Sequence, residues 1–196
     1  MGNVFFSYIE QNPIIAALSD LDKIDEVIES PCKIVFLLKG DIMNLEDIVN
    51  RLRQAGKFVC IHVDLIEGFS RHTVALEYID KIINPDGIIS TKSSIVKAAK
   101  NLGIFTIQRL FVLDSLALRT GKDSIKNIKT DAVELLPGLM PKVIREVHKE
   151  TRIPIIAGGL IRDKEDVIDA LNAGAIGAST SELKVWYMEV KPILNL

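Results

Sequence analysis

The chain has little of the residue types that often mark disulfide or metal chemistry. Its 196 residues include two cysteines, three histidines and one tryptophan. Cys32 and Cys60 form no CxxC pair and have no histidine cluster around them, which argues against a disulfide framework and a structural metal. We therefore expect a reduced, cytoplasmic protein without a metal or other cofactor.

Long hydrophobic runs and a leader-like start are also missing. No stretch of eighteen uncharged apolar residues occurs, so we expect no contact with a membrane. Residues 1–11 lack a basic segment followed by an apolar one, which predicts no secretory signal. The net charge is only −2, but it is unevenly distributed: residues 1–90 hold 8 Lys or Arg against 14 Asp or Glu, whereas residues 91–196 hold 16 against 12. A basic second half can mark a polyanion-binding side, and scattered surface charge can give the same asymmetry.

What the chain does contain is a regular alternation of apolar runs and amphipathic segments. Hydrophobic residues make up 48% of the chain, enough for a continuous core. Short continuous apolar runs are typical of parallel strands covered on both faces. Eight runs are found: 14–18, 34–38, 58–63, 87–90, 105–108, 132–136, 155–157 and 175–179.

Helical spacing separates these runs. The first example repeats apolar residues from Leu45 to Leu52, with Asn44 as the predicted N-cap and Gly56 as the stop. Residues 93–103 and 163–174 follow the same pattern, whereas 111–129 fits either one long helix or a loop and a shorter helix. The alternation predicts a single domain over residues 1–196, a compact TIM-like (β/α)8 barrel. A doubly wound open sheet would use the same alternation.

Small residues follow the last two predicted strands. Gly158 and Gly159 end one run, and Ser179, Thr180 and Ser181 end the next. Glycines allow close backbone approach and helix starts attract anions, so paired turns of this kind predict a phosphate site. The alternatives are an ordinary tight turn at the glycines and simple helix capping by the serines and threonine.

Charged residues follow several other predicted strands. Because ligands of a barrel sit at the carboxyl ends of its strands, we expect these side chains to line the mouth and to contact a polyol phosphate. They are Asp41, Asp64, Glu67, Lys92 and Arg109. The same positions leave an enzyme open, with Asp41 and Glu67 as acid and base or Lys92 as a Schiff-base lysine. His62 is more typical of a hydrogen-bonded core histidine.

Two rows of basic residues occur in the second half. Their spacing places each row on one helix face, which predicts a positive patch for RNA if the helices are neighbours. The alternative is an ordinary solvated face, since Asp123, Glu146 and Glu150 lie among them. The predicted RNA contacts are Arg119, Lys122 and Lys126 in the first row and Lys142, Arg145 and Lys149 in the second.

Several blocks of the chain together resemble a known family. Residues 60–68 read CIHVDLIEG, residues 85–92 read PDGIISTK and residues 106–111 read TIQRLF. With residues 36–42, 134–138, 141–144 and 156–161, these blocks resemble the glycerol uptake operon antiterminator regulatory proteins from about residue 13 to about residue 186.

The resemblance implies a bacterial regulator with a compact TIM-like barrel. Such a protein would sense glycerol 3-phosphate and bind the leader RNA of glycerol-utilisation genes, so that a terminator hairpin does not stop transcription. It implies no catalytic residue, and it leaves open whether the protein forms oligomers. The alternative function is a phosphosugar-metabolising barrel enzyme, such as an isomerase, an aldolase or a glycerophosphodiester hydrolase.

Overall fold

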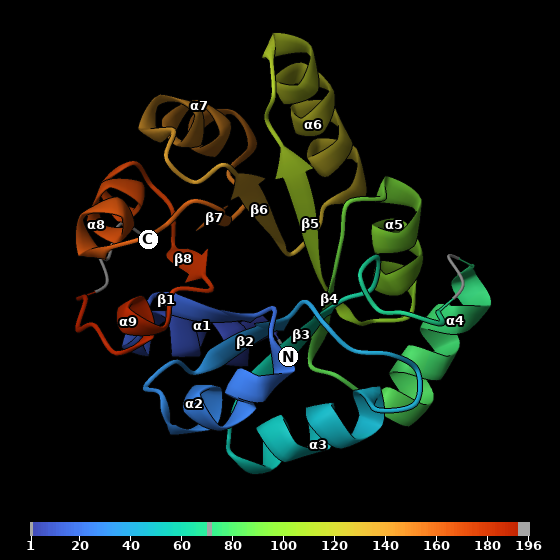
Figure 1. Ribbon diagram of the computed structural model, residues 1–196. Helices are drawn as coiled ribbons and strands as arrows, with labels where there is room; N and C mark the ends of the chain where they lie inside the picture. The colour runs from blue at the N-terminus through green and yellow to red at the C-terminus, as the bar shows by residue number, and fades with distance from the viewer. Residues whose placement is uncertain (1, 70–71, 192–196) are drawn as a thin grey trace.

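The computed structural model describes residues 2–69 and 72–191, and its strands form a closed barrel (Figure 1). Each strand pairs in parallel with the next, and the last strand pairs with the first. The strands are β1 (Ile14–Leu18), β2 (Ile34–Leu37), β3 (Phe58–His62), β4 (Gly87–Ser90), β5 (Phe105–Phe111), β6 (Ala132–Leu136), β7 (Ile155–Gly158) and β8 (Gly177–Thr180). The predicted (β/α)8 barrel is confirmed, and closure excludes the open doubly wound sheet.

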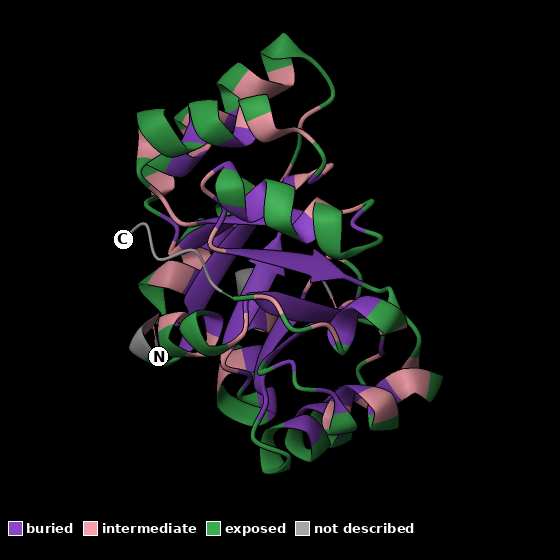
Figure 2. Ribbon diagram, turned by 90° about the vertical axis from the view of Figure 1, so that its left-hand side faces the viewer, coloured by how far each residue is buried: buried purple, intermediate pink, exposed green. Residues whose placement is uncertain are grey.

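Helices surround the barrel between successive strands (Figure 1). Their buried apolar faces pack on the outward-facing residues of the strands, as the helical spacing predicted. They are η1 (Leu21–Lys23), α2 (Ile24–Glu29), α3 (Leu45–Gln54), α4 (Thr73–Tyr78), η2 (Ile79–Ile83), α5 (Ser93–Asn101), α6 (Ser115–Ile128), α7 (Pro141–Thr151), α8 (Lys164–Asn172) and α9 (Leu183–Trp186). Figure 2 shows the buried strands enclosed by helices that are exposed on their outer faces.

One further helix, α1 (Gly2–Gln11), closes the amino-terminal end of the barrel. Phe5 is fully buried, and its ring centroid lies 5.4 Å from that of Phe58 and 4.7 Å from that of Phe105. Ile9 joins the same cluster of inward-facing strand residues. A barrel sealed at this end leaves the carboxyl ends of its strands as the open face.

The strand ends differ from the sequence prediction at two places that matter for the site. β5 continues beyond Gln108 to Phe111, because its last residues pair with β6 in the register Arg109↔Glu134 to Phe111↔Leu136. α6 then begins at Ser115, so the segment that the sequence left open is a strand end, a short loop and one helix.

β8 begins at Gly177, two residues later than predicted. The Ala175 N–H still donates to the Ala170 carbonyl at the end of α8, which keeps this residue out of the sheet. Gly177 itself must be small, since a Cβ there would lie 2.7 Å from the Pro13 carbonyl oxygen. At β2, β3 and β7 the predicted ends differ by one residue.

The prediction that the Asn44 side chain caps a helix is wrong. Asn44 occupies the N-cap position of α3, but its side chain makes no capping hydrogen bond to the helix. Its Oδ1 instead accepts from the Asp41 N–H at 2.9 Å. The Asp41 carboxylate in turn accepts from the N–H groups of Met43 and Asn44, so the aspartate organises this turn.

Candidate functional site

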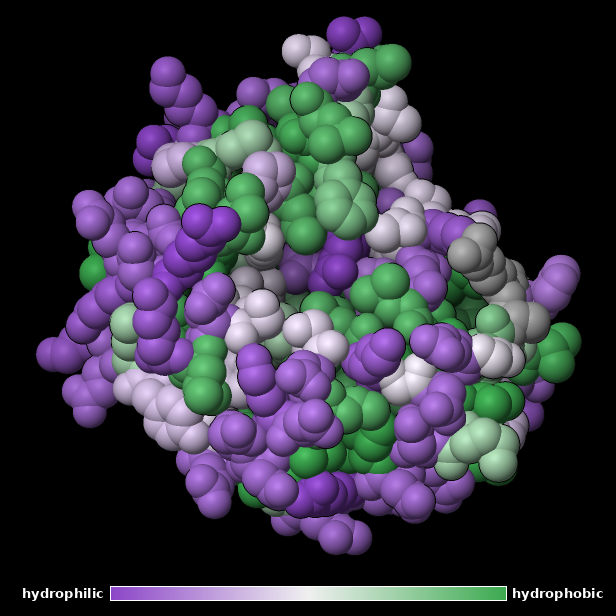
Figure 3. Space-filling model, in the orientation of Figure 1, coloured by the Kyte–Doolittle hydropathy of each residue, from purple (hydrophilic) through white to green (hydrophobic). Residues whose placement is uncertain are grey.

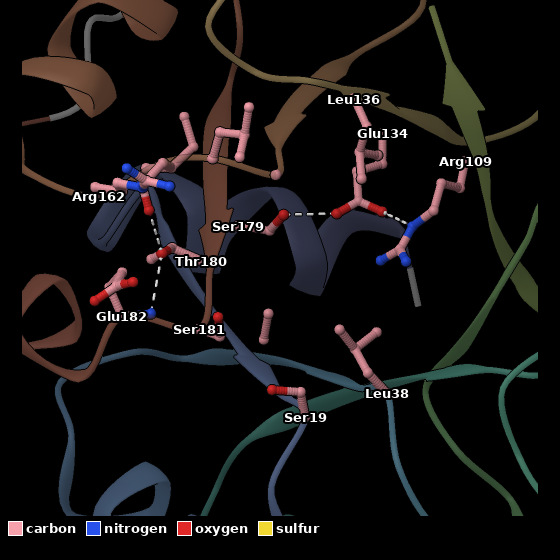
Figure 4. Close-up of a pocket in the computed structure, with 14 residues that line it drawn as sticks. Ser19, Leu38, Arg109, Glu134, Leu136, Arg162, Ser179, Thr180, Ser181 and Glu182 are labelled. Carbon is pink, nitrogen blue, oxygen red and sulfur yellow. Dashed lines mark hydrogen bonds and ion pairs between the residues drawn. The ribbon is translucent and has the colours of Figure 1, made fainter.

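A cavity of about 300 Å³ opens at the carboxyl ends of the strands. In Figure 3 it is the hollow near the centre of the face, with hydrophilic side chains at its bottom. The close-up in Figure 4 shows side chains from both halves of the barrel around it. The lining residues are Ala17, Ser19, Leu38, Arg109, Glu134, Leu136, Gly159, Leu160, Ile161, Arg162, Ser179, Thr180, Ser181 and Glu182.

The floor of the cavity is a buried ion pair with a hydroxyl. Arg109 Nε donates to Glu134 Oε2 at 2.5 Å, and Ser179 Oγ donates to Glu134 Oε1 at 2.6 Å (Figure 4). Only 1% of Glu134, 8% of Arg109 and 3% of Ser179 is exposed. These residues come from the adjacent strands β5 and β6 and from β8, all on the inward face. Taking two charges out of water costs free energy, so their pairing and hydrogen bonding are required for burial.

Gly158 lies directly against this ion pair. A Cβ on Gly158 would be 2.5 Å from Glu134 Oε1 and 2.8 Å from Ser179 Oγ, distances that real side chains do not reach. Gly138 packs on the other side, where a Cβ would be 3.0 Å from the Gly158 backbone nitrogen. The glycine at the end of β7 is therefore explained by the carboxylate of Glu134 on β6.

The outer wall is formed by the turns after β7 and β8. Gly159 has φ +72°, a left-handed conformation that favours glycine, and begins the turn toward Arg162. Thr180 Oγ1 donates to the Ile161 carbonyl at 2.6 Å and accepts from the Glu182 N–H at 3.1 Å, which ties the two turns together. The Trp186 indole N–H donates to the Thr180 carbonyl at 2.7 Å, and this hydrogen bond holds the end of β8 against α9.

The structure brings together most of the predicted phosphate site. Gly159 and the three residues Ser179, Thr180 and Ser181 line the cavity, and Gly158 lies beneath its floor. Arg109 lines it as well. These residues are in place to contact one small ligand, and their role in phosphate binding stays a prediction.

The other charged residues predicted for the mouth do not line this cavity. Asp41 is used in the turn before α3, and an isolated bridge pairs its backbone with that of Glu67. The Glu67 carboxylate is exposed and lies 3.8 Å from Lys39 Nζ. Lys92 is the N-cap residue of α5. Strand-end position alone does not direct a side chain into the barrel, since successive residues point to opposite faces.

Asp64 is held at the junction of β3 and β4, also outside the lining of the cavity. It accepts from Ser90 Oγ at 3.0 Å and from the Thr91 N–H at 2.7 Å. Burial alone would raise the pKa of Asp64, but the hydrogen bonds from Thr91 and Ser90 together outweigh it and hold the pKa below its usual value. Asp64 thus joins two strands of the barrel.

His62 is a buried residue of β3, as the sequence favoured, but it is not fully hydrogen-bonded. Only 2% of it is exposed, and among the described residues its Nδ1 has no hydrogen-bond partner. Burial, with a smaller contribution from the Arg109 guanidinium, lowers the pKa of His62 to about 4. The ring is therefore neutral at physiological pH.

Ser19 and Glu134 belong to the polar residues at the predicted strand ends, but the sequence did not single them out as ligand contacts, and it gave no indication of Arg162 or Glu182. For Glu134 a signal was present, because a lone acid interrupts the apolar run Ala132–Leu136 on the strand next to the one that carries Arg109. A charge in the middle of a barrel strand must face a partner or a ligand. Ser19 directly follows a predicted strand, whereas Arg162 and Glu182 lie further along their turns and carry no comparable signal.

Residues 14–186 match the family described as "Glycerol-3-phosphate responsive antiterminator". The chain belongs to this antiterminator family. The resemblance drawn from the sequence blocks is thereby confirmed.

Two solved structures with related names share the fold of this antiterminator-family chain. A glycerol uptake operon antiterminator regulatory protein from Listeria monocytogenes has a TM-score of 0.88 and 32% identity, over 91% of this chain and 96% of that one. A glycerol uptake operon antiterminator-related protein from Thermotoga maritima has a TM-score of 0.81 and 36% identity, over 89% and 98%. The uncharacterized protein YgcP of Escherichia coli (strain K12) is 41% identical over 183 residues, 93% of this chain and 96% of YgcP.

The two basic helices of this antiterminator-family chain are neighbours, as the RNA prediction required, but their charges are partly paired. Lys122 Nζ of α6 lies 2.6 Å from Glu146 and 3.0 Å from Glu150 of α7, and Lys126 lies 3.7 Å from Glu150. The hydrogen bonds that Lys122 donates to the two glutamates raise the pKa of Lys122. The two glutamates offset part of the positive charge of these lysines, and the RNA contacts of both rows stay a prediction. Arg119, Lys142, Arg145 and Lys149 are exposed.

No helix in the described part of the chain is both long and apolar enough to cross a membrane. Residues 2–69 and 72–191 also contain no group of three or more His, Cys, Asp or Glu side chains placed to hold a metal ion.

Proposed function

We propose that the protein is a glycerol 3-phosphate-responsive transcription antiterminator that binds the leader RNA of glycerol-utilisation genes. In this proposal it acts without a cofactor and catalyses no reaction. Membership of the antiterminator family supports the regulatory class. The observation that carries the choice of ligand is the cavity at the ends of β7 and β8, where barrels commonly hold phosphate.

The size and the lining of the cavity suit a three-carbon phosphate. About 300 Å³ is at the lower end of the range for small-molecule sites. The backbone of the Gly159 turn, the hydroxyl of Ser181 and the guanidinium of Arg162 supply the kinds of donor that hold a phosphate. Buried polar groups at the floor suit the hydroxyl-bearing part of the ligand.

A matched pair of substitutions tests the ligand site. Gly159→Asp and Gly159→Asn are of similar size, and both residue types tolerate the left-handed backbone found there. They differ in charge, so only the aspartate should repel a phosphate. At about 100 times the dissociation constant, glycerol 3-phosphate should stabilise the wild-type protein by about 2.7 kcal/mol, seen as a rise in melting temperature. The asparagine variant should keep more of this rise than the aspartate variant, and equal rises in both would place the phosphate elsewhere.

The proposed RNA surface is the exposed part of α7 with Arg119 of α6. Phosphate contacts release counterions, so the RNA affinity should fall with salt, with a log–log slope of roughly −0.7 per contacted phosphate of a single strand. Reversing the charges of Lys142, Arg145 and Lys149 to glutamate should lower the RNA affinity and leave glycerol 3-phosphate binding intact.

A second triple variant controls for net charge in the RNA experiment. Lys33, Lys97 and Lys184 are exposed on other parts of the molecule, and their reversal to glutamate changes the net charge by the same amount. This control should keep most of the RNA affinity. Equal losses in the two triple variants would mean that the α7 face is not the RNA surface.

The competing function is a phosphosugar-metabolising enzyme. Lys92, which the sequence left open as a Schiff-base lysine, is not among the residues that line the cavity. The buried Arg109–Glu134 pair is the feature that an enzyme could use, and it is tested by incubation with phosphosugars and glycerophosphodiesters. Turnover at about 1 per second or more would show that the protein is an enzyme and would contradict the regulatory proposal.

A further inference from the structure

The floor of the cavity has an unexpected charge for a phosphate site. A site that bound only phosphate would gain from cations and N–H groups at every wall. Here the deepest charged group is the carboxylate of Glu134, which is 1% exposed, and the lack of a side chain at Gly158 leaves room for it. A buried ion pair of this kind adds little stability compared with apolar packing. The carboxylate is therefore better explained by a ligand than by folding.

Both members of the pair have hydrogen-bonding capacity left for a ligand. Each oxygen of the Glu134 carboxylate receives one hydrogen bond from a described residue, and a carboxylate oxygen can accept about two. Arg109 bonds Glu134 through Nε, and within the described residues its two terminal nitrogens make no hydrogen bond. Figure 4 shows the Arg109 guanidinium and the Glu134 carboxylate side by side at one end of the cavity, with Arg162 and Glu182 at the other.

The groups at these two ends orient the ligand, since each end has one arginine and one glutamate and the outer end adds the backbone of the Gly159 turn. A phosphate placed on the floor would meet the negative carboxylate of Glu134 at close range, and like charges repel each other. Hydroxyl groups placed there would donate to the same carboxylate. The turn that begins at Gly159 and the guanidinium of Arg162 lie at the outer wall and suit the phosphate.

We propose that Glu134 selects a polyol monophosphate over phosphates that lack hydroxyl groups, with the hydroxyls on the floor and the phosphate at the outer wall. Arg109 and Ser179 hold the carboxylate in position for this contact. The inference rests on the proposed function, in which a three-carbon polyol phosphate is the ligand. It adds that the hydroxyl donors decide the specificity, so that a carbonyl in place of the central hydroxyl weakens binding.

The experiment compares ligands of graded chemistry by isothermal titration calorimetry. Wild-type protein is titrated with glycerol 3-phosphate, dihydroxyacetone phosphate, n-propyl phosphate and inorganic phosphate. We expect glycerol 3-phosphate to bind at least about tenfold more tightly than n-propyl phosphate, because a site built to receive hydroxyl donors leaves its acceptor unpaired when they are missing. Dihydroxyacetone phosphate should lie between the two.

Two variants then locate the selectivity. Glu134→Gln should bring the ratio of the two affinities, glycerol 3-phosphate over n-propyl phosphate, close to one. Glu182→Gln removes a negative charge from the outer end of the same cavity, so it should raise both affinities together and keep the ratio. If Glu134→Gln does not fold, the ratio of the two affinities measured on the wild-type protein still tests whether hydroxyl groups decide the specificity.

The outcomes separate this inference from the proposed function. Equal binding of glycerol 3-phosphate and n-propyl phosphate by the wild-type protein overturns the inference and leaves the proposed ligand in place. A selectivity that survives in Glu134→Gln overturns the role of Glu134. No binding of glycerol 3-phosphate by the wild-type protein overturns the proposed function, and the inference with it.

Discussion

Replacing Gly158 by alanine tests whether the buried carboxylate of Glu134 requires a glycine at this position. The added Cβ would lie 2.5 Å from Glu134 Oε1 and 2.8 Å from Ser179 Oγ, so at least one of these atoms must move. Gly158 is not among the glycines with positive φ, so alanine brings no left-handed backbone strain there. The cost is therefore a packing cost.

Its magnitude follows from two contributions. Overpacking a well-packed core costs about 1–3 kcal/mol. If the carboxylate moves, the 2.6 Å hydrogen bond from Ser179 is lost, and a hydrogen bond to a charged group contributes about 1.5–3 kcal/mol. The two costs overlap, because a carboxylate that moves also relieves part of the overpacking. We therefore expect a loss of about 2–4 kcal/mol in the free energy of unfolding. For a chain of 196 residues this lowers the melting temperature by roughly 4–16 °C.

The assay is thermal and urea unfolding followed by circular dichroism, with a double-mutant cycle as the decisive part. In a Glu134→Ala background the crowded carboxylate is gone, so Gly158→Ala should cost less there, with a coupling energy of about 1–3 kcal/mol. Gly103→Ala is the comparison for strain alone, since Gly103 has φ +83° and nothing within 4 Å of its Cβ position. If Gly158→Ala costs the same with and without the Glu134 side chain, the explanation of this glycine is wrong.

Three further predictions concern the barrel around the site. The pKa of His62 is lowered from 6.5 to about 4, so between these values the unfolded chain binds a proton that the folded chain does not, and stability should fall by up to about 3 kcal/mol as the pH drops through this window. The urea-unfolding profile of His62→Gln should lack this slope, and an unchanged profile would contradict the burial of a neutral ring. The pKa of Asp64 is also lowered, so its ionised form stabilises the folded protein above the usual pKa of an aspartate, and this stabilisation is lost as the pH falls through the folded value. Asp64→Asn should therefore lose less stability than the wild-type protein when the pH drops below about 4. Phe5→Ala should cost about 3–5 kcal/mol in urea unfolding because its fully buried ring closes the barrel against Phe58 and Phe105, and a cost below about 1 kcal/mol would mean that α1 does not seal this end.

The architecture was predictable because parallel strands that are buried on both faces appear in the sequence as continuous apolar runs. The run from Ala132 to Leu136 and the helix that begins at Leu45 illustrate this. The end of β5 was less predictable, since Arg109 and Phe111 are not typical of a buried strand and belong to it only through pairing with β6. Helix α1 had no apparent role in the sequence, because its burial depends on rings contributed by distant strands.

The candidate site was predictable where the backbone decides it and less so where side-chain direction decides it. Gly159 and Ser181 reach the cavity because turns after the last strands must face the mouth. Asp41 and Asp64 follow strands in the same way, yet each is used in local hydrogen bonds that the sequence does not specify. Glu134 stands near a predicted strand end, but the run Ala132–Leu136 does not tell which way its side chain points, and only the structure shows that it forms the floor of the cavity.

The most direct test of the account is transcription through the leader of a glycerol-utilisation gene from the same genome, measured in a purified system as the fraction of full-length transcript. The account predicts that read-through rises when the protein and glycerol 3-phosphate are both present, and that the rise is lost with Gly159→Asp. It also predicts that reversal of Lys142, Arg145 and Lys149 to glutamate removes the rise while glycerol 3-phosphate still binds. Read-through that is the same with and without glycerol 3-phosphate, in the presence of protein shown to bind it, would contradict the account.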